Sequence, residues 1–342
     1  MAQTYAVGMR QILVVVVTMV LLGCGKKAPE QQAEATLTPG IEAALKAHEA
    51  GNYGEAARLY TVELAAEEAK PAPSWVQLSK LHNELGRALH NAGQYDKALE
   101  HFQKTLAIYL KQLGPEHPHV ANSYNNIGSV HDKKGEYDHA LEYHQKALAI
   151  KLKQLGPEHP SVAFSYNNIG VVHYYTGEYD KALEHYQKAL AIELKQLGPE
   201  HPSVATSYNN IGAVHDNEGE YDKALEHHQK ALAIWLKQLG PDHPQVATSY
   251  NNIGAVHDEK GEYDHALEYH QKALAIELEQ LGPEHPSVAR SYNNMAYIYK
   301  TKKDLAKAKE YWEKTYAIFS EKLGPNHPNT KSVKARLDAL KE

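Results

Sequence analysis

A 42-residue repeat is the feature that most constrains how this chain can fold. The six-residue pattern LGPxHP recurs at intervals of 42 residues, beginning at Leu113, Leu155, Leu197, Leu239, Leu281 and Leu323. The copies are close relatives of one another, because segments 197–238 and 239–280 are identical at 34 of their 42 positions. A period of this length indicates a solenoid, in which each small unit buries its apolar face only by stacking on its neighbours.

Each repeat carries the start and stop signals of two helices. In the copy over 113–154, Pro118 suits the first turn of a helix, because its ring fixes φ and an N–H would have no partner there. Apolar and aromatic residues then recur at three- and four-residue steps. Gly135 can take the left-handed conformation that ends this helix, and a second helix follows it. Gly156 and the proline after it stop the second helix. The repeat therefore predicts a pair of helices.

Nine spaced residues in the repeat resemble the tetratricopeptide signature. In the same copy they are Tyr124, Ile127, Gly128, His131, Gly135, Tyr137, Ala140, His144 and Ala147. The length of 42 residues and the connector LGPEHPSVA resemble the kinesin light chain type of this repeat. The resemblance implies an all-α fold, a right-handed superhelical solenoid of antiparallel helix pairs that binds other proteins.

The repeats and the composition around them divide the chain into five parts. They are a signal peptide (1–23), a lipidated cysteine with a flexible tether (24–36), a short N-terminal unit (37–70), six 42-residue units (71–322) and a C-terminal capping helix (323–342). The first and last units depart from the signature, so we expect them to shield the ends of the array.

The N-terminus has the pattern of a secretory signal. Arg10 precedes the apolar run from Ile12 to Leu22, which is shorter than the roughly 20 residues that a membrane-spanning helix needs. Cys24, the single cysteine, follows Leu-Leu-Gly, and this arrangement resembles the bacterial lipobox. The resemblance implies lipid on Cys24, stable membrane anchoring and a location in the bacterial cell envelope, in either membrane. An ordinary signal peptide with an incidental cysteine is the alternative.

The sequence contains no motif that predicts catalysis. It has no glycine-rich phosphate loop, no HExxH pattern and no GxSxG pattern. A net charge of −6 provides no basic field for nucleic acid. We therefore expect no enzyme activity, no cofactor, no small-molecule substrate and no nucleic-acid partner, with an enzyme as the remote alternative.

Histidine is abundant, with 22 residues, but its placement predicts structural roles. One histidine precedes the proline of each first helix, at His117, His159, His201, His243, His285 and His327. Metal ligands must converge at about 2.0 to 2.1 Å from one ion, whereas one histidine per repeat gives a row of separate side chains. His131 and His144 occupy signature positions of packed aromatic residues. We expect no metal site.

Two consecutive asparagines follow the core tyrosine of each repeat and are the predicted peptide contacts. The second ones are Asn126, Asn168, Asn210, Asn252 and Asn294, and the first ones are Asn125, Asn167, Asn209 and Asn251. The resemblance implies that the second asparagine binds the backbone of an extended peptide, since an amide both donates and accepts hydrogen bonds. A solvated polar stripe, copied along with the repeat, is the alternative.

One repeat is unusually apolar at the predicted groove positions. Phe164, Tyr174 and Tyr175 predict an aromatic pocket, and acidic residues of neighbouring repeats such as Asp132 and Asp216 predict negative charge beside it. Random drift among recent duplicates is the alternative origin of these differences.

A variable position on the second helix predicts a further surface contact. Trp235 stands where other copies carry Lys151 or Glu193, and a position that tolerates charge is expected to be exposed.

Together these features predict a non-catalytic, membrane-anchored scaffold that captures a peptide segment or partner protein in its concave groove. An envelope assembly or spacing factor, acting through the length of the array, is the alternative.

Overall fold

The computed structural model describes residues 37–340, in which all regular structure is helical. The predicted signal peptide, Cys24 and the tether lie outside the described residues. The chain from Pro39 onward forms one compact unit. None of the helices between residues 37 and 340 is long and apolar enough to cross a membrane.

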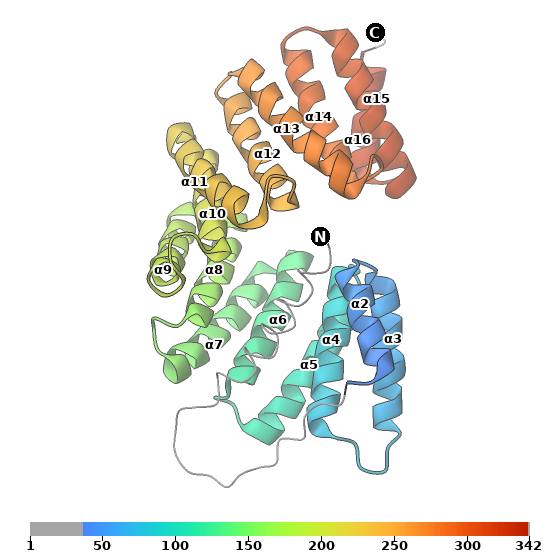
Figure 1. The fold of residues 1–342 in the computed structure, drawn as a ribbon, viewed down its shortest axis with the longest axis vertical. Coiled ribbons are helices and arrows are strands. Elements are labelled where there is room, and N and C mark those ends of the chain that lie inside the picture. Colours follow the sequence, from blue (N-terminus) through green and yellow to red (C-terminus); the bar gives the residue numbers. More distant parts are fainter. Residues whose placement is uncertain (1–36, 341–342) are drawn as a thin grey trace. The chain divides into compact units, whose positions relative to one another are not determined.

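The helices follow one another as antiparallel pairs, with consecutive helices packed side by side (Figure 1). The pairs are α2 (Pro39–Glu49) with α3 (Tyr53–Glu68), α4 (Trp75–Asn91) with α5 (Tyr95–Leu113), α6 (Pro118–Lys134) with α7 (Tyr137–Leu155), α8 (Pro160–Tyr175) with α9 (Tyr179–Leu197), α10 (Pro202–Asn217) with α11 (Tyr221–Leu239), α12 (Pro244–Glu259) with α13 (Tyr263–Leu281), and α14 (Pro286–Thr301) with α15 (Leu305–Lys322). A last helix, α16 (Pro328–Asp338), packs on α15. The fold is an all-α solenoid of helix pairs.

The predicted helix boundaries are confirmed in the repeat that holds α6 and α7. Helix α6 begins at Pro118, and the residue after its end, Gly135, has a φ of 74° in the left-handed region. Helix α7 ends at Leu155, directly before Gly156.

The histidine before each first-helix proline caps that helix. His201 Nδ1 accepts a hydrogen bond from the backbone N–H of Ser203 at 3.1 Å, which satisfies one of the donors left free at a helix start. The same bond begins each of the helices α6, α8, α10, α12, α14 and α16. The predicted role of these histidines in the turn is confirmed.

A glycine in the first helix lets the two helices of a repeat approach closely. A Cβ atom on Gly128 would lie 2.7 Å from His144 Cε1, and one on Gly170 would lie 2.5 Å from Tyr186 Cε1. Both distances are too short for real carbon contacts. Glycine at these positions therefore serves the packing of the two helices.

The terminal helices extend the core at both ends of the array. Tyr60 of α3 is fully buried in a cluster with Leu85 of α4. At the other end, Val333 of α16 is buried with Phe319 of α15, and Thr330 Oγ1 donates to the Phe319 carbonyl at 3.2 Å.

Trp235 corrects one sequence-based prediction. Its side chain is only 4% exposed and packs among Ala205, Val246 and Ala273 of three neighbouring helices. Lys151 and Glu193, which hold the same position in other repeats, are also buried. Asn167 and Ser207 bond the Glu193 carboxylate, and the Lys151 ammonium lies 5.4 Å from the centroid of the Phe164 ring, so a charged residue at this position does not indicate exposure.

Candidate functional site

The first asparagine of each pair bonds side chains on neighbouring helices. Asn125 on α6 is 4% exposed, and its Oδ1 lies 3.2 Å from His144 Nδ1 on α7. Asn209 repeats this contact with His228 at 3.1 Å. These amides connect the two helices of a repeat, because the helix face they occupy is covered by its partner helix.

Two buried carboxylates extend the asparagine network between repeats. Glu193 on α9 accepts hydrogen bonds from Asn167 Nδ2 at 3.1 Å and from Ser207 Oγ at 2.6 Å. Glu277 on α13 makes the corresponding bonds with Asn251 at 3.0 Å and Ser291 at 2.7 Å. Each carboxylate thus joins its own repeat to the first helix of the next.

The environment of these carboxylates favours the protonated form. Burial raises the pKa of Glu193 to about 7, although the hydrogen bonds from Ser207 and Asn167 act in the opposite direction. Burial also raises the pKa of Glu277.

The second asparagines are half-buried, and two of them bond to the preceding repeat. Asn126 Nδ2 donates to Asn83 Oδ1 at 2.9 Å, and Asn252 Nδ2 donates to Asn209 Oδ1 at 2.8 Å. Asn168 Nδ2 is buried without a partner in the described chain.

The remaining second asparagines share the half-buried position but not the hydrogen bond. Asn210 and Asn294 are half-buried, and neither makes a side-chain hydrogen bond among residues 37–340. In the last helix Arg336 takes the place of a second asparagine, and its Nη1 donates to Asn293 Oδ1 at 3.3 Å.

A pocket of about 380 Å³ gathers part of the predicted site. It is lined by Asn83, Arg87, Tyr109, His119, Asn122, Ser123, Asn125, Asn126 and Phe164. Phe164 is 56% exposed and reaches this pocket from α8, two repeats along the chain from Asn83. The ring of Tyr109 stacks on that of His119, with centroids 5.1 Å apart.

The buried Lys151 adjoins Phe164. Its Nζ lies 5.4 Å from the centroid of the Phe164 ring, and burial lowers the pKa of Lys151 to about 8. Lys151 is the equivalent of Glu193 in the following repeat, where the Glu193 carboxylate accepts a hydrogen bond from Asn167. Consistent with that substitution, Asn125 Nδ2 is buried without a hydrogen-bond partner in the described chain.

Tyr174 and Tyr175 do not join this pocket. The hydroxyl of Tyr174 accepts from Asn217 Nδ2 of the next repeat at 2.8 Å, and Tyr175 stacks on Tyr137 of the preceding repeat. Ten residues of helix separate Phe164 from Tyr174, or about 15 Å along its axis. The three aromatic residues therefore form two separate features.

The acidic residues predicted beside the pocket do not line it either. Asp132 Oδ2 lies 2.9 Å from His144 Nε2, and its side chain is 16% exposed. Asp216 is half-buried, and burial raises its pKa to about 6. The charged side chain that lines the pocket is instead Arg87, whose Nη1 donates to Glu84 Oε2 at 3.1 Å.

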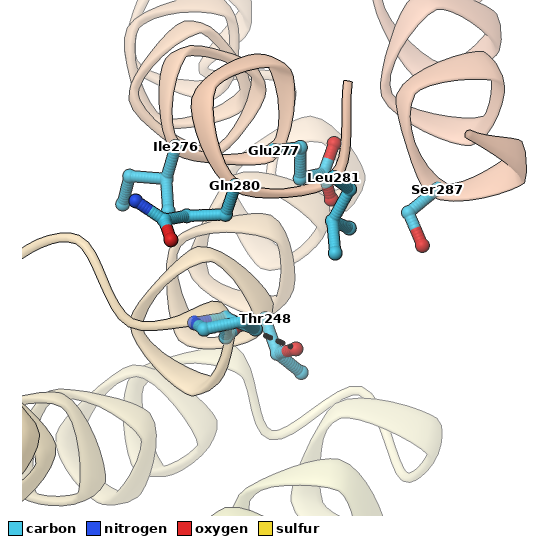
Figure 2. A pocket seen from close by; sticks show the side chains of 7 residues that line it. Thr248, Ile276, Glu277, Gln280, Leu281 and Ser287 are labelled. Carbon is cyan, nitrogen blue, oxygen red and sulfur yellow. Dashed lines mark hydrogen bonds between the residues drawn. The ribbon is translucent and has the colours of Figure 1, made fainter. Parts of the chain in front are cut away.

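A second, smaller pocket of about 70 Å³ lies at the Glu277 carboxylate. Figure 2 shows its lining side chains, which include Thr248 of α12, Glu277 of α13 and Ser287 of α14. Beside this pocket Asn251, the equivalent of Asn125, donates to Glu277, as does Ser291.

Two clusters of histidine and glutamate were not predicted from the sequence. His131, Glu136 and His139 lie together where α6 meets α7, and His257, Glu262 and His265 lie together where α12 meets α13. The signal in the sequence is the pattern HxxxxExxH. We did not interpret this pattern as a cluster, because the position of His131 in the repeat signature already explains that histidine as a packed aromatic residue.

Comparison with known proteins identifies the repeat. The tetratricopeptide repeat family matches residues 77–153, 140–193, 161–217, 203–279 and 266–311, which together span more than half of the chain. The chain belongs to the tetratricopeptide repeat family. Tetratricopeptide repeats are typically non-catalytic and generally mediate protein–protein interaction through the extended surfaces of their arrays. A search of curated proteins finds no match.

Solved structures include tetratricopeptide arrays of the expected type. A P. anserina kinesin light chain with nearly identical TPR-like repeats is 27% identical, with a TM-score of 0.50, over 59% of this chain and 97% of that one. BtubC (BKLC) from P. vanneervenii is 22% identical, with a TM-score of 0.53, over 72% and 93%. A tetratricopeptide protein from Parabacteroides merdae is 15% identical, with a TM-score of 0.57, over 89% and 98%. Kinesin light chain-like proteins are thus among the structural neighbours, as the 42-residue period predicts.

Proposed function

We propose that this tetratricopeptide protein is a membrane-anchored scaffold that captures an extended segment of a partner protein. The segment binds at the pocket between Tyr109 and Phe164. The single observation that carries the proposal is the amide of Asn125, which lines this pocket and holds a buried, unpaired donor.

An unpaired buried donor is costly, so an acceptor from a ligand would relieve it. Leaving such a group without a partner costs about 1–3 kcal/mol. In two other repeats the equivalent amide has an internal acceptor, since Asn167 bonds Glu193 and Asn251 bonds Glu277. Asn125 lacks one because Lys151 stands at that position. A peptide carbonyl can take the same role after a small rotation of the amide.

The rest of the pocket indicates the chemistry of the bound segment. The rings of Tyr109 and Phe164 offer contact to an apolar or aromatic side chain. Arg87, whose side chain is 54% exposed, can donate to a carbonyl or carboxylate of the segment. We infer an extended peptide with an apolar anchor and neutral or acidic neighbours.

Selection of peptides from a displayed random library, with the full chain in detergent as the target, tests this function. The affinity of the selected peptides is then measured for the wild-type chain and for the variant Phe164→Thr. Threonine is the replacement because Thr206 and Thr248 hold this position in other repeats. We expect binding to weaken by about tenfold, because truncation of an aromatic anchor costs more than about 1 kcal/mol.

Two further variants test whether the peptide binds at this pocket. Lys151→Glu supplies an internal acceptor for Asn125 and should also weaken binding. Thr206→Ala, at the equivalent position outside the pocket, is the matched control and should leave binding unchanged. Selected peptides that bind the Phe164→Thr and wild-type chains equally would contradict the proposal.

We also propose that the scaffold is held at a bacterial membrane by lipid on Cys24. The support is the position of this cysteine directly after the apolar run and Leu-Leu-Gly. Expression in a bacterium with labelled fatty acid should label the wild-type chain and leave Cys24→Ala unlabelled. Equal labelling of both chains would refute lipidation at this residue.

A further inference from the structure

We propose that the array binds two divalent transition-metal ions of the zinc class, at two clusters three repeats apart. The clusters are His131–Glu136–His139 and His257–Glu262–His265. In each, one potential ligand atom from every residue lies within 4.8 Å of the other two. This inference is independent of the peptide pocket, whose lining contains none of these six residues.

The local fold brings the three ligands of each cluster together. His131 lies in the last turn of α6, Glu136 is the residue directly before α7, and His139 lies in the first turn of α7. The left-handed Gly135 reverses the chain between the two helices, so the ends of both helices face the same carboxylate.

The distances between ligand atoms bracket those of a zinc site. Glu262 Oε2 lies 2.6 Å from His257 Nδ1 and 3.8 Å from His265 Nδ1. Zinc–ligand bonds of about 2.0–2.1 Å in tetrahedral geometry place the ligand atoms about 3.3 Å apart. Small side-chain rotations therefore suffice, and the side chain of His265 is 66% exposed and has room to make them.

Neighbouring side chains hold the buried histidine and the carboxylate in place. The ring of His131 stacks on Tyr143 with an interplanar angle of 4°, and the ring of His257 stacks on Tyr269 with one of 9°. Lys134 Nζ lies 3.0 Å from Glu136 Oε1, which leaves Oε2 directed at His131. Contacts that fix the orientation of ligands in this way strengthen metal binding.

The donor set selects the class of metal. Two imidazoles and one carboxylate suit zinc and similar transition metals, whereas magnesium and calcium prefer oxygen ligands alone. Three protein ligands leave a fourth tetrahedral position for water or for a side chain of a partner protein.

Other repeats in the chain supply internal controls. In the repeat of His173, the second histidine is replaced by Lys181, whose Nζ donates to Glu178 Oε1 at 2.6 Å. An ammonium group carries no lone pair for a metal, so this repeat should not bind one.

The repeat of His215 differs in its donors. Lys223 pairs with Glu220 there, and Glu218 completes a cluster with a single imidazole. We therefore assign zinc to the two clusters with paired histidines.

Calorimetric titration of the full chain with zinc chloride tests the assignment. The wild-type chain should bind two ions, His139→Lys should bind one, and the double variant His139→Lys/His265→Lys should bind none. Lysine is the replacement because the repeats of Lys181 and Lys223 already fold with it. The reverse change, Lys181→His, should add a third ion.

Several outcomes would overturn the proposal. They are a wild-type chain that takes up no zinc, a double variant that still binds two ions at other histidines, and a Lys181→His chain without a third site. Thermal unfolding of the metal-free chains checks that the variants are folded. Added zinc should raise the unfolding temperature of the wild-type chain and not that of the double variant.

Discussion

At the scale of single residues, the glycine that α4, α6, α8, α10 and α12 share controls how tightly a repeat is packed. Gly170→Ala should destabilise the chain by about 1–3 kcal/mol, because the added Cβ would lie 2.5 Å from the Tyr186 ring. The control is Gly54→Ala, where a Cβ meets nothing within 4 Å and where the change should be neutral or slightly stabilising. Urea unfolding followed by circular dichroism measures both, and equal effects would argue against the packing role.

The buried histidines behind these glycines make stability depend on pH. Burial lowers the pKa of both His228 and His270 to about 4, below the value of about 6.5 in an unfolded chain. Their contribution is complete above pH 6.5 and is lost as the pH falls towards 4, since the unfolded chain then binds more protons.

Replacing one of these histidines should reduce this acid sensitivity. Phe102 fills the same position opposite Gly86, so His228→Phe should fit, and Asn209 keeps its bond from Asn252. Between pH 7 and pH 5 the wild-type chain should lose up to about 2 kcal/mol more than this variant. Urea unfolding at several pH values measures the difference, and parallel curves for the two chains would contradict the prediction.

At the scale of helices, the buried carboxylates join one helix pair to the next. Glu193 on α9 accepts from Asn167 on α8 and Ser207 on α10, and burial raises its pKa to about 7. The unfolded value is near 4.5, so the folded chain binds the extra proton. The stability that this proton contributes is present at pH 4.5 and is lost as the pH rises through 7.

Glu193→Gln removes this titration and therefore isolates it. The free energy of unfolding of the wild-type chain, minus that of the variant, should fall by on the order of 2 kcal/mol between pH 5 and pH 8. Chemical unfolding at each pH gives the difference. A value independent of pH would show that Glu193 titrates normally. The direction is opposite to that of the histidines, so the two effects are separable.

At the scale of the whole molecule, the helices within residues 37–340 make their main contacts inside their own repeat and with the adjacent repeat. Deleting residues 198–239 joins Leu197 to Gly240 and restores the 42-residue register. The shortened array should keep the same helix content per residue and unfold at a modestly lower urea concentration, because a solenoid loses only one unit and one interface. Circular dichroism measures both quantities, and a collapse of helicity would contradict independent stacking.

The fold follows from local signals, which is why the sequence predicts so much of it. The helix boundaries at Pro118, Gly135 and Gly156 depend on backbone restrictions of single residues. The repetition of one unit then forces stacking, since a lone helix pair leaves its apolar face uncovered.

Prediction of the candidate site requires knowledge of the contacts between repeats, and the spacing of residues within one repeat does not reveal these contacts. Asn125 and Trp235 have the sequence pattern of surface residues, yet both are 4% exposed because the adjacent helices cover them. Phe164 and Tyr174 share one helix, but only Phe164 reaches the pocket with Tyr109.

The sequence by itself determined the repeat and its two helices, because both depend on residues near one another in the chain. Only the tertiary structure decided which polar groups are paired. The Glu193 carboxylate, the unpaired amide of Asn125 and the two histidine clusters all depend on how one helix end meets the next. Pairing depends on differences of a few tenths of an ångström in the distance between donor and acceptor, which a residue pattern does not encode.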